Sequence, residues 1–210
     1  MLVTAIERTK KGRFSIFCDG DFCCALHADV FAAAPIIVGA EIAPEELEEL
    51  RVQSETRITK DRALRLLSAR AYTAYGLQRK LLAYTDEDIA AEAVARMVEL
   101  GLVDDLDYAR RYAADCMRQK GFSLARTRQA LREKGIDRDT ADEVLAEMDE
   151  DAEPAIARII LKKYSRYLDD EKGRLRTMNG LLRLGYRHGE IRTVLENLLE
   201  DESYYDDEEA

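Results

Sequence analysis

Apolar side chains recur along this chain at spacings of three and four residues, and the arrangement returns about every fifty residues. Leu131 precedes the corner Lys134-Gly135, and Leu181, fifty positions later, precedes Leu184-Gly185. Leu81 lies fifty positions before Leu131. Because spacings of three and four place side chains on one helix face, the pattern predicts amphipathic helices. Their return at a fixed period predicts an array of helical repeats.

The apolar stripes predict three helices in each of three repeats. These helices are expected at Asp61–Ala71, Leu77–Tyr84 and Asp86–Leu100, then at Leu106–Gln119, Ser123–Lys134 and Asp139–Met148, and finally at Pro154–Arg166, Lys172–Leu184 and Glu190–Leu199. Gly101, Gly135 and Gly185 stand where helices should end, because glycine readily adopts the left-handed conformation that closes a helix. In the first repeat Tyr84-Thr85 replaces the corner that the other two repeats share.

The first thirty residues follow a period of two instead. Apolar and polar side chains alternate near Val3 and again over Phe14–Cys18, and Asp19-Gly20-Asp21 is a turn signal before Phe22–Leu26. This predicts a β-hairpin or a small three-stranded sheet. Further on, Pro44 and the glutamates after it favour the start of a helix that should run to about Ser54.

We therefore predict a mainly α fold, with tandem three-helix repeats forming an elongated curved array behind a small N-terminal β-hairpin or sheet. The expected divisions are an N-terminal β element at 1–43, a connecting helix at 44–59, repeats at 60–103, 104–149 and 150–199, and an acidic, disordered tail at 200–210.

The composition limits the cell compartment and the kinds of partner that we expect for this protein. No apolar run is long enough to span a bilayer, and no N-terminal stretch reads as a signal peptide, so we expect a cytoplasmic protein with no membrane partner. The net charge is −10, but the charges are uneven: residues 154–195 hold ten basic and four acidic side chains, whereas the last fifteen hold eight acidic ones and none that is basic. A local basic strip can act despite a distant acidic tail, because the Debye length is about 8 Å at physiological salt.

Candidate reactive chemistry is sparse. Cys18, Cys23, Cys24 and Cys116 form no C-x-x-C pair, and neither histidine has a partner at zinc-ligand spacing. No phosphate-binding glycine loop or nucleophile–base pair is recognisable either. We expect reduced, mostly buried thiols, no metal or other cofactor, no catalytic residue, and therefore no enzymatic activity.

Several motifs occur together in one order. They are Ala63–Arg70, the junction Gly101–Asp105, the aromatic helix Tyr108–Tyr112, the corner Gly121–Ser123, and the ending Leu131–Ile136. With these motifs the chain resembles the RecX family of recombination regulators, over about Lys60 to Leu199. That family shows an aromatic-Ala-x-x-Tyr helix, a Gly-aromatic corner and an L-x-x-K-G-I ending.

The resemblance implies a regulatory protein that binds the RecA recombinase filament, meaning the recombinase together with single-stranded DNA. Such a protein lowers ATP hydrolysis, strand exchange and the co-protease activity of the filament, and so acts in DNA repair and the SOS response. The resemblance implies contact with more than one protomer of the filament. We expect a monomer that also binds bare DNA weakly and in a salt-sensitive way.

Basic side chains of the second and third repeats are the candidate contacts for phosphates or for an acidic partner surface. Arg128 and Arg132 are four positions apart, as are Arg183 and Arg187, so each pair is expected to share a face. Solvated helix surface is the alternative interpretation of these charges. The candidates are Arg118, Lys120, Arg126, Arg128, Arg132, Lys134, Lys162, Lys163, Arg166, Arg174, Arg176, Arg183 and Arg187.

Two other functions stay open from the sequence alone. One is a DNA-binding regulator of the helical-repeat or helix-turn-helix kind, which would concentrate basic residues in one short bihelical unit. The other is a protein scaffold that does not act on RecA, which would show little sensitivity to salt. Tyrosines such as Tyr108 and Tyr112 have helical spacing, which favours packing over stacking on bases.

Overall fold

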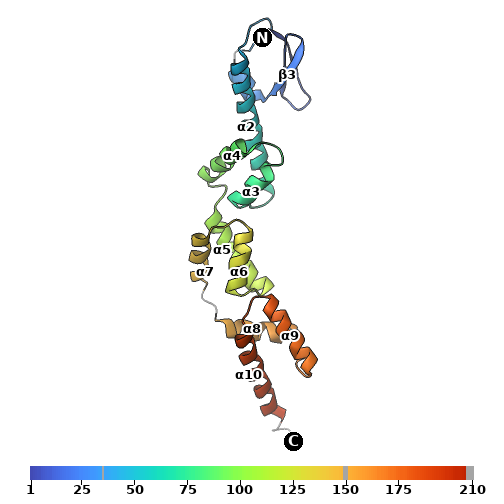
Figure 1. Ribbon diagram of the computed structural model, residues 1–210, viewed down its shortest axis with the longest axis vertical. Coiled ribbons are helices and arrows are strands. Elements are labelled where there is room, and N and C mark those ends of the chain that lie inside the picture. The colour runs from blue at the N-terminus through green and yellow to red at the C-terminus, as the bar shows by residue number, and fades with distance from the viewer. Residues whose placement is uncertain (35, 149–150, 207–210) are drawn as a thin grey trace. The chain divides into compact units, whose positions relative to one another are not determined.

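The computed structural model describes residues 1–34, 36–148 and 151–206, with side chains described up to Glu200 (Figure 1). The chain divides into two compact units, Met1–Asp104 and Asp105–Ala210. Both are mainly helical and contain three-helix repeats, and a small antiparallel sheet begins the first unit. The predicted class of fold, helical repeats behind a small N-terminal sheet, is confirmed in these elements.

The first unit opens with the predicted sheet, in the order β1-β2-β3 with antiparallel neighbours. Its strands are β1 (Val3–Arg8), β2 (Phe14–Cys18) and β3 (Asp21–Leu26). Asp19 and Gly20 join β2 to β3 with positive φ values of 51° and 93°. Two consecutive positive φ values match the twist of a tight hairpin, which is why Asp-Gly is favoured at this turn.

One face of the sheet packs on a long helix, α2 (Pro44–Ala69), and forms the first core. Ile16 and Leu26 from the sheet are buried in this core with Leu47 of α2. A short helix that was not predicted, α1 (Ala28–Ala33), follows the sheet. Five of its six residues, ADVFAA, are apolar, so the segment shows no alternation of polar and apolar positions that would mark a helix.

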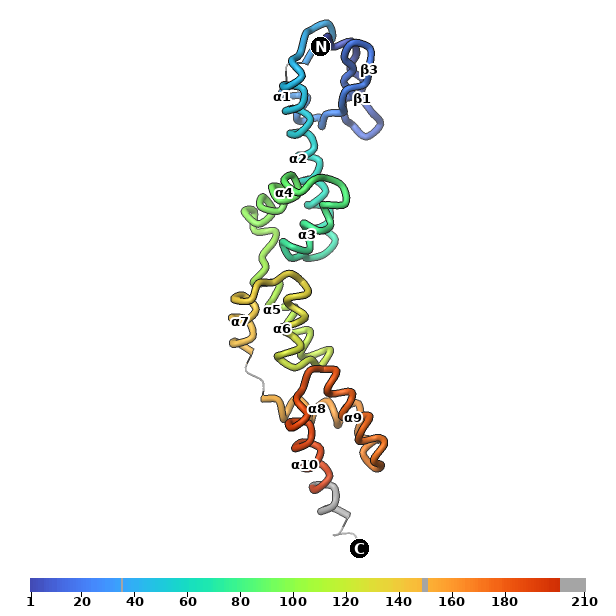
Figure 2. Tube along the Cα trace, in the orientation of Figure 1, coloured from blue at the N-terminus to red at the C-terminus, as the bar shows by residue number. Residues whose placement is uncertain are grey.

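The helices predicted at Pro44–Ser54 and Asp61–Ala71 are in fact one helix, α2. Polar side chains between the two predicted ranges are satisfied by neighbouring groups. Ser54 Oγ accepts a 2.6 Å hydrogen bond from the backbone N–H of His27, and Lys60 Nζ lies 2.7 Å from Glu92 Oε1. Residues 45–69 hold no proline or glycine that would interrupt the helix. Figure 2 shows α2 passing from the sheet to the first repeat.

In the first repeat α2 packs with α3 (Ala74–Leu81) and α4 (Glu87–Glu99). The helix predicted at Leu77–Tyr84 begins and ends earlier than expected, because Thr73 caps it by accepting a 3.0 Å hydrogen bond from the backbone N–H of Gly76. Neither Tyr84 nor Thr85 has a positive φ, so this corner differs from the glycine corners elsewhere.

The second unit holds the second and third repeats. Their helices are α5 (Asp105–Asp115), α6 (Leu124–Glu133) and α7 (Arg138–Ala146), then α8 (Ala152–Lys163), α9 (Glu171–Arg183) and α10 (His188–Asp206), with a π-helical turn η1 (Cys116–Lys120) and a 3-10 turn η2 (Ser165–Tyr167). The helix predicted to continue to Gln119 therefore widens into a π-helical turn at Cys116. Gly121, with φ of 73°, ends that turn.

The period of fifty residues marks equivalent places in the three repeats. Leu81, Leu131 and Leu181 are each fully buried on the second helix of their repeat. Gly135 and Gly185 have φ values of 81° and 94° at the predicted corners. The hydrophobic period therefore sets both the buried seam and the turns.

The C-terminal helix extends beyond its predicted end. We predicted a disordered tail from 200 onward, whereas α10 continues to Asp206. Leucine and glutamate have high helix propensity, and Leu198, Leu199 and Glu200 extend the helix without a breaker. Residues 207–210 lie outside the described part of the chain. The predicted domain boundaries themselves remain predictions.

Candidate interaction surface

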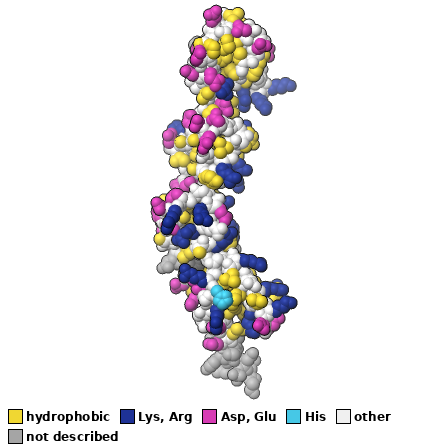
Figure 3. All heavy atoms as spheres, viewed as in Figure 1, with side chains coloured by type: hydrophobic (Ala, Val, Ile, Leu, Met, Phe, Trp, Pro, Cys, Tyr) yellow, Lys and Arg dark blue, Asp and Glu magenta, His cyan; other side chains and the backbone are white. Residues whose placement is uncertain are grey.

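The candidate cations lie on the surface of the second and third repeats. Eleven of the thirteen are exposed, and Arg126 and Arg174 are half-buried. Figure 3 shows Lys and Arg side chains gathered over both of these repeats. Exposure alone does not distinguish a binding surface from a solvated one. The two interpretations differ in whether nearby carboxylates already pair with these cations.

A groove between α6 and α7 brings three arginines together. It encloses about 660 Å³ and is lined by Arg128, Arg132 and Arg138, with the carboxylates Asp137 and Asp142. Arg128 Nε lies 2.7 Å from Asp142 Oδ1, and Arg138 Nε lies 3.5 Å from Asp142 Oδ2. The hydrogen bond from Arg128 lowers the pKa of the Asp142 carboxyl, so it stays ionised at neutral pH.

Arg132 has no ion-pair partner within the described residues. Three guanidinium groups therefore face two carboxylates, and the α6–α7 groove keeps a net positive charge. Guanidinium forks match the geometry of phosphate and carboxylate oxygens. Arg128 and Arg132 line the same groove, as their spacing predicted.

A second cluster surrounds the corner between η1 and α6. Lys120 Nζ lies 4.8 Å from the centre of the Tyr112 ring and 5.5 Å from that of Phe122. Lys134 Nζ lies 5.3 Å from the Tyr112 ring, and the Arg126 guanidinium lies 5.3 Å from the Phe122 ring. These cation–π contacts hold the cations in place at the surface. Tyr112 also packs against the Tyr108 ring, which confirms packing over free exposure.

The third repeat carries its cations in a different setting. The guanidinium groups of Arg166 and Arg176 lie 5.0 and 5.3 Å from the centre of the Tyr167 ring. Arg174 donates to the carbonyl oxygen of Leu168, 3.3 Å away, and so supports the fold locally. Among the described residues, none of the seven candidate cations of this repeat forms an ion pair with a carboxylate. This distinguishes them from Arg51 and Arg57 of α2 and from Arg138 of α7, which do.

The expectation that Arg183 and Arg187 share one helix face is wrong. Arg183 ends α9, and Arg187 precedes α10, with Gly185 between them. The φ of 94° at Gly185 turns the chain, so a spacing of four residues does not correspond to one helical turn here.

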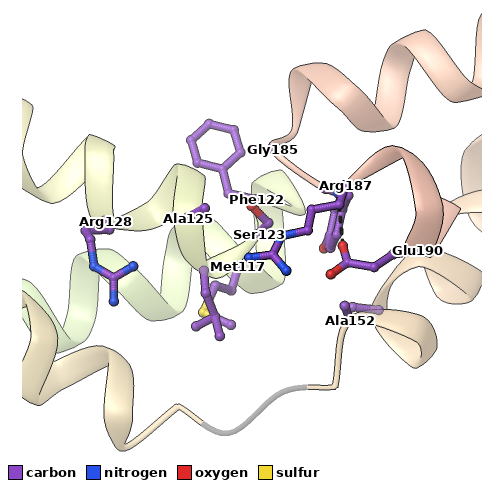
Figure 4. A pocket seen from close by; sticks show the side chains of 12 residues that line it. Met117, Phe122, Ser123, Ala125, Arg128, Ala152, Gly185, Arg187 and Glu190 are labelled. Atoms are coloured by element: carbon purple, nitrogen blue, oxygen red, sulfur yellow. Dashed lines mark hydrogen bonds between the residues drawn. The ribbon is translucent and has the colours of Figure 1, made fainter.

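A pocket of about 280 Å³ lies where the second and third repeats meet (Figure 4). Figure 4 shows the side chain of Arg187 reaching across it toward Ser123, with Arg128 on the far side. The backbone N–H of Arg187 donates to Glu190 Oε2 over 2.9 Å, which caps the start of α10. Arg128 lines both this pocket and the α6–α7 groove.

Sequence reasoning omitted Arg138 from the candidates, although it lines the groove. The corner at Gly135 was the available signal, because it turns α7 back along α6 and brings Arg138 beside Arg128. It also passed over the exposed leucines Leu175 and Leu182. Comparing the outward positions of the three repeats at the period of fifty would have found them.

The cysteines are free thiols. Cys18, Cys24 and Cys116 are buried, and Cys23 is half-buried. Burial raises the pKa of both Cys18 and Cys24 to about 11, so these thiols stay protonated and unreactive at neutral pH. Within the described parts of the chain, no cluster of His, Cys, Asp and Glu side chains could hold a metal ion.

None of the helices in the described ranges combines the length and the apolar character needed to cross a bilayer.

Comparison with known proteins follows the three-helix repeats. The model of the first three-helix domain of RecX matches residues 60–97, and that of the second three-helix domain matches residues 104–145. A crystal structure of a regulatory protein RecX superposes with a TM-score of 0.67 at 22% identity, covering 93% of this chain and 98% of that one. The structure of RecX from Lactobacillus salivarius gives 0.60 at 23% identity, covering 70% of this chain and 97% of that one. At these identities the likeness concerns the fold.

Sequence relatives extend the match. The regulatory protein RecX of Pectobacterium atrosepticum is 33% identical over 154 residues, which is 64% of this chain and 94% of that protein. The regulatory protein RecX of Clostridioides difficile is 27% identical over 208 residues, covering 97% of this chain and 98% of that protein. Repeat architecture, motifs and these relatives agree, and the chain belongs to the RecX family.

Proposed function

We propose that this protein binds the RecA recombinase filament and inhibits its ATP hydrolysis, strand exchange and co-protease activity, as a regulator of DNA repair and the SOS response. Membership of the RecX family supports the partner. The observation that carries the proposal is the excess of positive charge on the second and third repeats, where three arginines face two carboxylates in the α6–α7 groove and the seven candidate cations of the third repeat form no ion pair with a carboxylate among the described residues.

The α6–α7 groove suits the phosphates of filament-bound DNA. Arg128, Arg132 and Arg138 present guanidinium groups from two helices to one open groove. In the free protein Asp142 holds Arg128 and Arg138 in position. Phosphate oxygens of bound DNA would compete with the Asp142 carboxylate for these two arginines. The net charge of −10 makes this chain repel bare DNA at long range. The groove can therefore attract phosphates only when they are within about one Debye length of it.

Inhibition follows from binding many sites weakly and together. Repeats that each make modest contacts gain overall affinity because the second contact is intramolecular once the first has formed. A protein that contacts more than one protomer restrains the protomers against the movements of the ATP cycle. Regulation of this kind needs no catalytic group, and the curated relatives are named regulatory proteins rather than enzymes.

Co-sedimentation with RecA tests the partner. Filaments are assembled with and without single-stranded DNA and nucleotide, and the bound fraction of this protein is measured over a salt series. We expect binding that requires the assembled filament and weakens as salt rises, because phosphate contacts release counterions. Arg128→Ala/Arg132→Ala should bind less, whereas Arg96→Ala, which removes an arginine paired with Glu99 in the first unit, should bind as the wild type does.

Other outcomes would favour the rival functions. Equal, salt-sensitive binding to bare duplex DNA with no preference for the filament would indicate a DNA-binding regulator. Binding to neither DNA nor filament would indicate a scaffold for a different protein.

A further inference from the structure

The period of fifty residues also compares the outward faces of the three repeats. Along the second helices, α3, α6 and α9, equivalent exposed positions fall at 75, 125 and 175, and again at 82, 132 and 182, where position 82 is the C-cap of α3. A separation of seven residues is two helical turns, so both positions of a pair lie on one face.

The third repeat exposes two leucines at these positions. Leu175 is 58% exposed and Leu182 is 40% exposed. Lys172, Arg176 and Arg183 lie beside them on α9, and all three are exposed without a carboxylate partner in the part of the chain that the structure describes. Leucine in water is unfavourable, because each Å² of apolar surface left exposed costs about 25 cal/mol.

A shallow groove of about 470 Å³ continues this face toward α10. Leu175 and Met178 of α9 line it with Leu195 and Leu199 of α10. The apolar surface is therefore continuous beyond the two leucines, and at its edge the cations Lys172, Arg174 and Arg192 outnumber the carboxylates Glu171 and Glu196.

The first repeat shows the same arrangement independently. Tyr75 is 47% exposed and Leu82 is 43% exposed. Arg79 and Lys80 lie between them, and the Arg79 guanidinium is 5.7 Å from the centre of the Tyr75 ring. Two repeats thus present a pair of large apolar side chains with cations beside them.

The second repeat differs at both positions. It carries Ala125 and Arg132, which line the α6–α7 groove. The fold of a repeat therefore does not require apolar side chains here, although it does require the buried leucine one position earlier, at 81, 131 and 181. The exposed pairs on α3 and α9 are therefore available to a partner.

We propose that the outward faces of α9 and of α3 each dock on a protein surface that presents apolar side chains ringed by carboxylates. This inference rests on the proposed function, in which the protein component of the filament supplies that surface. Charge complementarity selects the occupant, because an apolar centre whose rim carries a net positive charge fits an apolar centre with an acidic rim.

Nucleic acid fits the α9 face less well. Bases bind by stacking on flat rings, and phosphates bind cations, but neither buries leucine side chains. Leu175 and Leu182 offer no stacking surface, whereas Tyr75 on α3 does, so the crosslink from position 75 decides between protein and DNA on that face. The α6–α7 groove has arginines and no large exposed apolar side chain, so it suits phosphates better than an apolar protein surface.

Site-specific photo-crosslinking on the full-length protein tests the inference. Benzoylphenylalanine replaces Leu175, Tyr75 or, as the matched position of the second repeat, Ala125, and each protein is irradiated with RecA filaments on labelled single-stranded DNA. Crosslinks from positions 175 and 75 should go to the recombinase polypeptide. Crosslinks from 175 and 75 that go mainly to DNA, or to a second copy of this chain, would overturn the inference.

Affinity gives the second measurement. Leu175→Ala/Leu182→Gln removes the apolar pair from an exposed face and should weaken filament binding about tenfold, as expected for truncating interface anchors, while leaving binding to bare DNA unchanged. Filament binding equal to that of the wild type would contradict the inference while leaving the proposed function intact. If the wild-type chain itself does not bind the filament, the proposed function fails and the inference fails with it.

Discussion

The backbone N–H of Ser123 donates a 2.9 Å hydrogen bond to the carbonyl oxygen of Leu184, and this bond ties the second repeat to the third. The same Ser123 caps α6, where its Oγ accepts from the backbone N–H of Arg126 over 3.2 Å. One residue therefore starts the helix that carries Arg128 and Arg132 and also fixes the corner of the next repeat.

Gly185→Ala should destabilise the second unit at this junction. The substitution places a Cβ 2.6 Å from both Ser123 Oγ and the Cβ of Arg126, at a φ of 94° that disfavours alanine. Strain and overpacking together should lower the free energy of unfolding by about 2–4 kcal/mol. Urea denaturation of the wild type and the variant measures this difference in the free energy of unfolding.

Gly101→Ala is the matched control for Gly185→Ala. Its φ of 67° imposes similar backbone strain, but nothing lies within 4 Å of the added Cβ. Its cost should be about 1 kcal/mol. Equal losses from both substitutions would show that close packing against Ser123 is not what Gly185 provides.

Gly180→Ala should also destabilise, although glycine normally weakens a helix. The added Cβ would collide with the hydroxyl of Tyr164 and lie 2.9 Å from its Cζ atom, so the ring of Tyr164 must move. We expect a loss of about 1–3 kcal/mol. Gly189→Ala, which meets nothing within 4 Å in α10, should be neutral or stabilise by up to about 1 kcal/mol. Thermal melting of both variants compares them, and a stabilised Gly180→Ala would refute the contact.

Thr127 and Thr177 occupy equivalent positions fifty residues apart and should respond oppositely to valine. Thr127 Oγ1 is buried without a hydrogen-bond partner among the described residues, so Thr127→Val should stabilise by about 1 kcal/mol. Thr177 Oγ1 donates to the carbonyl oxygen of Gly173 over 3.0 Å, so Thr177→Val should destabilise by about 0.5–1 kcal/mol. Equal shifts in the urea midpoint for the two variants would contradict this difference.

Asp142→Asn should strengthen binding to single-stranded DNA, because it releases Arg128 and Arg138 from their shared carboxylate. The plot of log affinity against log salt should become steeper, by about one counterion per arginine newly bound to phosphate. Asp139→Asn removes the same charge from α7 without an arginine contact, and it should change affinity less. Identical effects of the two substitutions would indicate general charge rather than the groove.

The same carboxylate predicts the dependence on pH. The pKa of Asp142 is lowered in the folded chain, so its ion pairs contribute stability above its ordinary pKa, and that contribution is lost as pH falls through the lowered value. Between pH 6 and pH 8, binding through the groove should therefore not change because of Asp142. A titration of DNA affinity over this range checks the expectation.

Much of the fold was predictable because packing repeats. Leu81, Leu131 and Leu181 indicated the buried face of each repeat, because a large apolar side chain favours burial. Gly135 and Gly185 indicated the corners, because glycine readily adopts a positive φ. The partners of Ser54 and Lys60 in α2 were not predictable, because His27 and Glu92 are distant in sequence. Pairing of that kind is decided by the tertiary structure.

The candidate surface was predictable in composition but not in grouping. The charge run indicated the second and third repeats, yet whether a cation is paired depends on its neighbours across a groove, as at Asp142. Arg183 and Arg187 show why grouping was not predictable. Their spacing of four residues would place them on one face only in a continuous helix, and Gly185, with a positive φ, ends that helix between them.

The most direct test of the central claim is ATP hydrolysis by RecA on single-stranded DNA with increasing amounts of this protein. We predict progressive inhibition, which weakens at high salt and in the Arg128→Ala/Arg132→Ala variant. An unchanged rate of hydrolysis at a stoichiometric excess of the wild-type protein over RecA would contradict the account.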